Sequence, residues 1–326
     1  MKTKMNLLKR SFVLLAFIGL TFLVTDCSDS VTNPASINNQ SNLPTMDKEA
    51  IKTIAEQDSA VSSFDQNYTE NQTDNFLSKT GSEIAPFFVW QHVIQTDKSY
   101  DFNVVGDSVY VKVTKTFQGV LNIIASTQGP GTKPDTIVTK NFNSVMVRQL
   151  LFQRIDSTDN PFDNWKLEGI SLVSGGTTTD NFIINKLTVT LSDTSNFEIT
   201  SPEDYFISRG DKWYKWNKWH HFPECGTRDS VTVSVEVYSA YADTDFVSIT
   251  YGANFFGLHR NKIKLELVSS TSSGSGFTKV YQRTFRFGKY HGYYHAVLNA
   301  FTRQSIYDDA APVESKSWGF PYKVRD

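Results

Sequence analysis

The chain has 326 residues, of which 39% are hydrophobic and 13% aromatic, so it is long enough for about two domains with packed cores. Its 32 Lys and Arg residues nearly balance 34 Asp and Glu residues, and the formal net charge of -2 excludes the basic footprint of a general nucleic-acid binder. The two cysteines are too few for a disulfide framework or a cysteine-rich zinc site.

The first 26 residues have the pattern of a secretory signal peptide. Basic residues lie within the first ten positions, before an uncharged apolar run over residues 11–24. This run is shorter than the roughly 20 apolar residues that a membrane-spanning helix needs. We therefore expect residues 1–26 to be removed and to take no part in the fold.

Cys27 lies at the end of this segment and is followed by a polar stretch. A cysteine in this place resembles the lipobox of bacterial lipoproteins, in which the thiol is acylated and becomes the first mature residue. That family usually has Gly, Ala or Ser before the cysteine, whereas this chain has Asp26, so an ordinary cleaved signal or an uncleaved anchor is the alternative. The resemblance implies lipidation of Cys27 and attachment to the bacterial cell envelope, at the outer membrane, the cell surface or the periplasmic face.

Residues 27–45 are expected to form a flexible tether that begins at the lipidated cysteine. They are polar, rich in Asn and Ser, and interrupted by Pro34 and Pro44, a composition that does not favour a packed core. The tether would hold the rest of the protein away from the membrane.

Residues 46–200 are expected to form an α+β domain. Ile51, Ile54 and Ala55 recur at helical spacing and predict an amphipathic helix of about four turns. Further along, residues 108–116 alternate between valine and polar residues, which is the period of a strand with one buried face. Turn residues such as Gly106-Asp107 and Gln118-Gly119 separate the predicted strands. These strands are expected at residues 87–95, 99–105, 108–116, 118–126, 135–142, 144–155 and 164–173.

This order of a helix and long strands, with residues 147–154 leading into residues 165–171, resembles an NTF2-like (cystatin-like) cone over residues 46–173. In that fold a helix packs inside a curved sheet, and the resemblance implies a concave mouth that can hold a ligand or an active site. The candidate residues on that surface are Trp90, His92, Arg148 and Arg154, and the register of the strands decides which of them point inward. The alternative is a β-sandwich with a helical lead-in.

Residues 229–326 are expected to form a β-sandwich. Residues 231–237 alternate strictly between valine and other residues, and about six or seven strands are expected before the C-terminus. This pattern resembles an immunoglobulin-like module without the paired cysteines of antibody domains. Pro321 lacks an N–H group and predicts that the last strand lies at a sheet edge. The alternating strand within residues 180–200 is compatible with either domain.

Between the two predicted domains, residues 201–228 form an aromatic-rich segment in which Lys-Trp pairs repeat every three residues. Exposed rings of this kind stack on sugars or lipid interfaces, and interleaved lysines favour anionic partners. The alternative is that the rings pack in the seam between the domains, because tryptophan is highly buried on average. The candidate ligand-binding residues are Lys212, Trp213, Lys215, Trp216, Lys218 and Trp219.

No pattern in the chain predicts a metal site or a cofactor. On a strand, His291 and His295 lie on one face but well separated, and no glutamate follows as in HExxH. Cys225 lacks a second cysteine and is expected to be buried or inert, although nearby histidines are compatible with a reactive thiol. Ordinary turn chemistry explains the aspartates that calcium would otherwise use. The histidines and aspartates of these patterns are His220, His221, Asp156, Asp159, Asp163, Asp308 and Asp309.

The motifs of nucleophilic hydrolases and phosphate-binding loops are also missing from the sequence. We therefore expect a lipid-anchored envelope protein with a non-catalytic binding or scaffolding role. Its partners would be the membrane, through the anchor, and a polysaccharide or an envelope protein, but no nucleic acid. The alternatives are an envelope hydrolase acting on carbohydrate, whose carboxylates have no local motif, and a subunit of a surface assembly.

Overall fold

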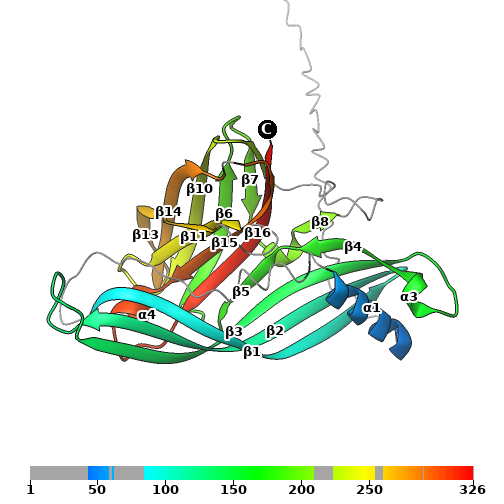
Figure 1. Cartoon of the computed structure of the whole chain (residues 1–326), viewed down its shortest axis with the longest axis horizontal. Helices are drawn as coiled ribbons and strands as arrows, with labels where there is room; N and C mark the ends of the chain where they lie inside the picture. The colour runs from blue at the N-terminus through cyan, green and yellow to red at the C-terminus, as the bar shows by residue number, and fades with distance from the viewer. Residues whose placement is uncertain are drawn as a thin grey trace, which may run out of the picture. The chain divides into compact units, whose positions relative to one another are not determined.

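The computed structural model describes residues 43–58, 61, 84–208, 223–253, 260–288 and 290–325 (Figure 1). The predicted signal peptide, Cys27 and most of the predicted tether lie outside these residues. The same holds for residues 209–222, which contain all the Lys-Trp pairs. What the sequence predicts for these segments therefore stays a prediction.

The described residues are mainly β, which confirms the predicted fold class, and most strands belong to one of two sheets. The larger sheet has the order β1 (Ala85–Val105), β2 (Ser108–Ser126), β3 (Thr136–Arg154), β5 (Val173–Thr177), β16 (Ser315–Arg325), β15 (Gly292–Phe301), β11 (Phe246–Ala253) and β12 (Asn261–Lys264). Three short strands join it at the side: β4 (Trp165–Ser171), β8 (Phe206–Ser208) and β9 (Glu224–Gly226). The smaller sheet has the order β13 (Glu266–Ser273), β14 (Gly276–Arg286), β10 (Ser230–Ser239), β6 (Phe182–Thr190) and β7 (Asn196–Ile199).

Helices are short in the described part of the chain. They are α1 (Thr45–Gln57), α3 (Pro161–Asn164), α4 (Arg303–Tyr307) and the 3₁₀ helix η1 (Pro202–Asp204). None of the helices found there is long and apolar enough to cross a membrane. The first of them, α1, confirms the helix predicted from the spacing of Ile51, Ile54 and Ala55.

Strands β1, β2 and β3 are each about twice as long as predicted, because each one joins two of the expected strands. The turn predicted at Gln118-Gly119 is wrong: Gly119 lies within β2 and pairs with Val93 on one side and Phe142 on the other. A Cβ atom at Gly119 would clash with the Phe142 ring, so the glycine is required for close packing rather than for a turn. The turn predicted at Gly106 is confirmed, with a φ of 60° between β1 and β2.

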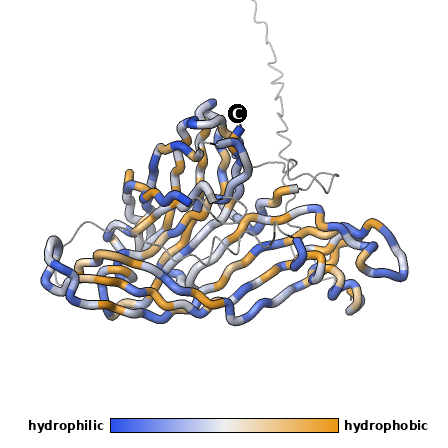
Figure 2. The backbone as a smooth tube through the Cα atoms, in the orientation of Figure 1, coloured by the Kyte–Doolittle hydropathy of each residue, from blue (hydrophilic) through white to orange (hydrophobic). Residues whose placement is uncertain are grey.

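The three long strands present one buried face, which we call the inner face. It carries the odd-numbered residues of β2 and the even-numbered residues of β3, and Figure 2 shows the resulting alternation of hydropathy along these strands. At one end, α1 packs on Val109, Val111 and Leu150. At the other end, residues of α4 and β11 pack on Leu121 and Ile123. The two ends of the inner face are therefore covered by two different parts of the chain, and between them Phe117 and Met146 form a smaller buried cluster with Val173.

A buried carboxylate fastens α1 to the sheet. Asp47, in the first turn of α1, accepts hydrogen bonds from Trp165 Nε1 at 3.0 Å and from Arg154 Nη2 at 3.4 Å. The Arg154 guanidinium lies over the Trp165 ring, 5.3 Å from its centroid. These contacts fix the first turn of α1 to the ends of β3 and β4, while Ala55, near the C-terminal end of α1, lies beside Val113 and Met146.

The smaller sheet packs against β11, β15 and β16 to form a β-sandwich, as the valine alternation of residues 231–237 predicted. The strand within residues 180–200 belongs to this sandwich, because β6 pairs with β10 over most of its length. Two pairings join residues on either side of the predicted interdomain segment: β6 with β10, and β5 with β16.

The prediction that the last strand lies at an edge is wrong, because β16 pairs with β15 on one side and with β5 and β9 on the other. The N–H of Lys323 donates to the carbonyl of Pro223, on the β9 side. Alternation places the nitrogen of Pro321 on that same side, between the residues that pair with β5 and those that pair with β9. A missing N–H is tolerated in this interior strand because it falls in the interval between two short partners.

Replacement of Asp47 by Ala should destabilise the protein by about 1–3 kcal/mol, because the buried Trp165 N–H loses its acceptor. Urea unfolding measures this change, and Glu49→Ala, an exposed position on the same helix, serves as the control with a change below about 0.5 kcal/mol. Equal effects of the two substitutions would show that Asp47 does not fasten α1.

Candidate functional site

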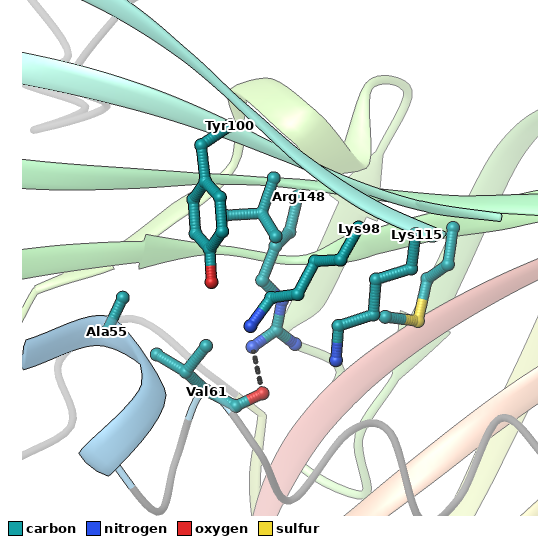
Figure 3. A pocket seen from close by; sticks show the side chains of 8 residues that line it. Ala55, Val61, Lys98, Tyr100, Lys115 and Arg148 are labelled. Atoms are coloured by element: carbon teal, nitrogen blue, oxygen red, sulfur yellow. Dashed lines mark hydrogen bonds between the residues drawn. The ribbon is translucent and has the colours of Figure 1, made fainter. Parts of the chain in front are cut away.

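A pocket lies on the inner face of the sheet, beside the C-terminal end of α1 (Figure 3). Its empty space is about 260 Å³ when the open solvent at its mouth is included. The lining residues come from α1, from Val61 four positions beyond its end, and from all three long strands: Ala55, Val61, Lys98, Tyr100, Val113, Lys115, Met146 and Arg148. The pocket thus occupies the interval between the two covers of the inner face.

Two cations of the pocket are carried inward by strand alternation. Lys115 follows Val113 on the buried side of β2, and Arg148 follows Met146 on the buried side of β3. Their side chains are 7% and 1% exposed, which is unusual for charged residues. In a strand every second side chain shares a face, so the apolar neighbours determine where these charges lie.

The third cation reaches the pocket because of an irregularity in β1. The register with β2 shifts between Gln95 and Asp97, so that one extra residue is inserted in β1. Before the shift, odd-numbered residues such as Val89 face inward, and after it even-numbered residues such as Lys98 and Tyr100 do so. Without this bulge Lys98 would lie on the opposite face of the sheet.

Hydrogen bonds hold the polar groups of the pocket in place. Arg148 Nη1 donates to the carbonyl oxygen of Val61 at 2.8 Å, as the dashed line in Figure 3 shows. At the rim, Glu56 accepts from the Tyr100 hydroxyl at 2.8 Å and from Lys98 Nζ at 3.0 Å. The Tyr100 hydrogen bond, and next the bond to Lys98, lowers the pKa of the Glu56 carboxyl. Glu56 is therefore ionised at neutral pH and orients two of the lining side chains.

The positive charge of Arg148 also affects the pKa of His295 in β15, outside the pocket. Burial lowers the pKa of His295 to about 4, and repulsion from the Arg148 guanidinium contributes in the same direction. His295 is thus neutral at pH 7. The buried region around Arg148 disfavours a second positive charge.

Of the four residues predicted to share the concave surface, only Arg148 lines the pocket. Arg154 lies on the same face but at the strand end, where it contacts Asp47 and Trp165. Trp90 and His92 lie on the opposite face, because the residues of β1 on either side of them, Val89 and Val93, face inward. The register therefore turns Arg148 and Arg154 inward and Trp90 and His92 outward.

The other candidate ligands and nucleophiles do not converge among the described residues, where no group of three or more His, Cys, Asp or Glu side chains is placed to hold a metal ion. Cys225 is buried, as expected, and burial raises the pKa of its thiol to about 11. His291 is exposed while His295 is buried. Asp156, Asp163 and Asp308 accept hydrogen bonds within their own turns, and His220 and His221 lie outside the described residues.

Sequence reasoning missed Lys98, Tyr100 and Lys115. For Lys115 a signal was present, because it occupies a valine position in the alternation of β2 between Val113 and Phe117. A charged residue in the buried series of a strand is a candidate for a functional group. No local signal predicts the inward turn of Lys98, since it depends on the bulge at Gln95–Asp97.

The chemistry available in the pocket is electrostatic. Three cationic groups and a phenol ring meet beside short apolar side chains, and the described residues that line the pocket include no carboxyl, imidazole or thiol group. Such a set can attract an anion and orient it by hydrogen bonds, since lysine and arginine are donors only.

Acidification should destabilise the protein through His295. Its pKa is about 4 in the folded chain and 6.5 ordinarily, so the unfolded chain binds more protons between these values. The contribution of neutral His295 is complete above about pH 6.5, and about 3 kcal/mol of it is lost as the pH falls to about 4. Urea unfolding at several pH values should show a shallower loss in His295→Gln and no change in slope for His291→Gln. Identical slopes in the parent and His295→Gln would refute this role.

Comparison of the chain with protein-family models, curated proteins and solved structures finds no match. The basis for its function is therefore the chemistry of its own residues.

Proposed function

We propose that this protein is a lipid-anchored cell-envelope protein that binds a small organic anion in the pocket beneath α1. The observation that carries the proposal is the meeting of Lys98, Lys115 and Arg148 in one pocket, with two of these side chains almost wholly buried. All three side chains carry hydrogen-bond donors, so an anion in the pocket would accept charge-assisted hydrogen bonds from them.

The energetic argument concerns desolvation. Burial of Lys115 and Arg148 removes water from two charges, while Lys98 pairs with Glu56 at the rim. A carboxylate or phosphate group in the pocket would replace part of the lost hydration with charge-assisted hydrogen bonds. The planar guanidinium of Arg148, held by the Val61 carbonyl, is suited to such an acceptor.

The remaining lining residues limit the size and character of the ligand. Ala55, Val113 and Met146 provide apolar side chains beside the cations. A small carboxylate or phosphate ester with a short apolar body matches this combination of charge and apolar surface.

Binding is favoured over hydrolysis by the composition of the pocket. Glycoside hydrolysis requires two carboxyl groups that flank the bond to be cleaved, and the described lining residues supply none. The pocket has a hydroxyl only in Tyr100, which already donates to Glu56. The proposal is therefore a binding protein rather than an envelope hydrolase.

The location in the proposal comes from the N-terminal sequence. The apolar run over residues 11–24 followed by Cys27 supports export and lipidation, and residues 27–45 would serve as the tether. In this proposal the helix and long strands correspond to the NTF2-like part and the sandwich to an immunoglobulin-like module. The ligand would be a component of the envelope or of the space around it.

At least one small organic anion should bind in the pocket, and Lys115→Met should lower its affinity about tenfold or more. Isothermal titration at low salt with acetate, benzoate, inorganic phosphate and phenyl phosphate tests this and separates carboxylate from phosphate recognition. Lys112→Met is the matched control, because Lys112 lies on the same strand but on the opposite face.

Equal affinities of the parent, Lys115→Met and Lys112→Met for every anion would contradict the pocket. Anion binding that is lost only in Lys112→Met would place the site on the opposite face of the sheet from the pocket. Circular dichroism and urea unfolding of each variant show that the fold is retained.

Lipidation should be visible in the intact mass of the protein from detergent extracts of a bacterial host. The expected mass is that of a chain that starts at an acylated Cys27, and Cys27→Ala should lose both the added mass and the membrane association. An unacylated parent would contradict the anchor and leave the anion pocket as a separate question.

A further inference from the structure

The opposite side of β1–β3, which we call the outer face, is covered at one end and open at the other. At the covered end η1 and β8 pack on it: the Tyr110 ring meets Phe206 edge-on at 6.0 Å, and Lys112 pairs with Glu203 at 3.5 Å. At the open end four cross-strand rows run side by side, from Phe88–Ile124–Ile137 to Ile94–Gln118–Asn143. Ile94 and Ile137 are 60% and 64% exposed there.

The open end carries no formal charge. None of its twelve positions is Asp, Glu, Lys or Arg, although 20% of the chain is charged and protein surfaces are richer in charge than the average. Charge returns in the next outer-face row, at Asp97, and further along at Asp101 and Lys112. An exposed sheet face without charge fits an uncharged partner, because no ionic group has to be desolvated on binding.

The two middle rows combine an aromatic ring with amide and hydroxyl groups. Trp90 lies in one row with Asn122 and Thr139, and its ring centroid is 5.5 Å from that of Phe88. Thr139 donates to Asn122 Oδ1 at 3.1 Å, so the Asn122 amide presents its Nδ2 group as a donor in the same row as Trp90. His92 and Asn141 continue the pattern in the next row.

This pattern matches the chemistry of a sugar ring. A pyranose has an apolar C–H face that stacks on an aromatic ring and hydroxyl groups at its edge that bond to amides. The rows repeat at roughly 6.7 Å along the strands and about 4.8 Å across them, so a chain of sugars meets similar groups at successive positions.

The size of the open end disfavours a second copy of the protein as the partner. Stable protein interfaces use about 20–30 residues a side, and this surface offers twelve positions in which apolar and polar rows are mixed. A narrow polysaccharide chain needs less surface.

We infer that the open end of the outer face, around Trp90 and Asn122, is a binding platform for an uncharged polysaccharide. This site is distinct from the anion pocket, which lies on the other face of the same strands. The two sites have opposite requirements, since one takes a charged small molecule and the other a neutral chain.

Affinity gel electrophoresis tests the platform, with hydroxyethyl cellulose, laminarin, dextran and α-mannan as the four probes. At least one should retard the parent protein, and Trp90→Ala should lower the affinity about tenfold or more. Asn141→Asp, which adds only a charge at an exposed position, should also weaken retardation. Phe162→Ala, an exposed aromatic outside the platform, should have no effect, and the thermal midpoint of each variant reports folding.

Failure of all four polysaccharides to retard the parent would overturn the inference, as would retardation that Trp90→Ala and Asn141→Asp leave unchanged. Dimerisation of the parent in analytical ultracentrifugation that is lost in Trp90→Ala would assign the face to a second copy instead. Anion binding measured on the same variants is expected to be unaffected, so the two sites are tested independently.

Discussion

The register of β1, β2 and β3 is the constraint on which the rest of the structure depends. In a strand each side chain belongs to one of two faces, and a shift of one residue exchanges them. The pairing of these long strands places Lys115 and Arg148 inward, and the bulge at Gln95–Asp97 adds Lys98 to them. The same register turns Trp90 and Asn122 outward. Both candidate sites therefore follow from one alignment of three strands.

Apolar packing at the two ends of the long strands offsets the free-energy cost of burying charged residues between them. Apolar clusters under α1 and under α4 supply most of the burial on the inner face, and the cations occupy the interval between them. The buried ion pair of Lys279 with Asp245, at 2.7 Å, shows a contrasting solution in the sandwich, where a charge meets its partner directly. At the pocket, by contrast, Glu56 lies at the rim, where it pairs with Lys98 at 3.0 Å, while Lys115 and Arg148 are almost wholly buried.

Much of the fold could be predicted from the sequence, because α1, the valine alternation of β10 and the turn at Gly106 are local signals. The length of β2 could not, since Gly119 has the composition of a turn and its role depends on Phe142 of another strand. The interior position of β16 in the sheet could not be predicted either. A proline without an N–H group is tolerated at position 321 only because β5 ends before it and β9 begins after it. The pocket was only partly visible: Arg148 was a candidate, but the bulge that brings Lys98 beside it is a property of strand pairing.

A crystal structure of the protein grown with the most tightly bound anion of the titration panel tests the central claim most directly. We predict that the anion lies within hydrogen-bond distance of Lys115 and Arg148, with its apolar part against Val113 and Met146. A pocket filled by a carboxylate of the chain itself, with the added anion elsewhere or absent, would contradict this claim.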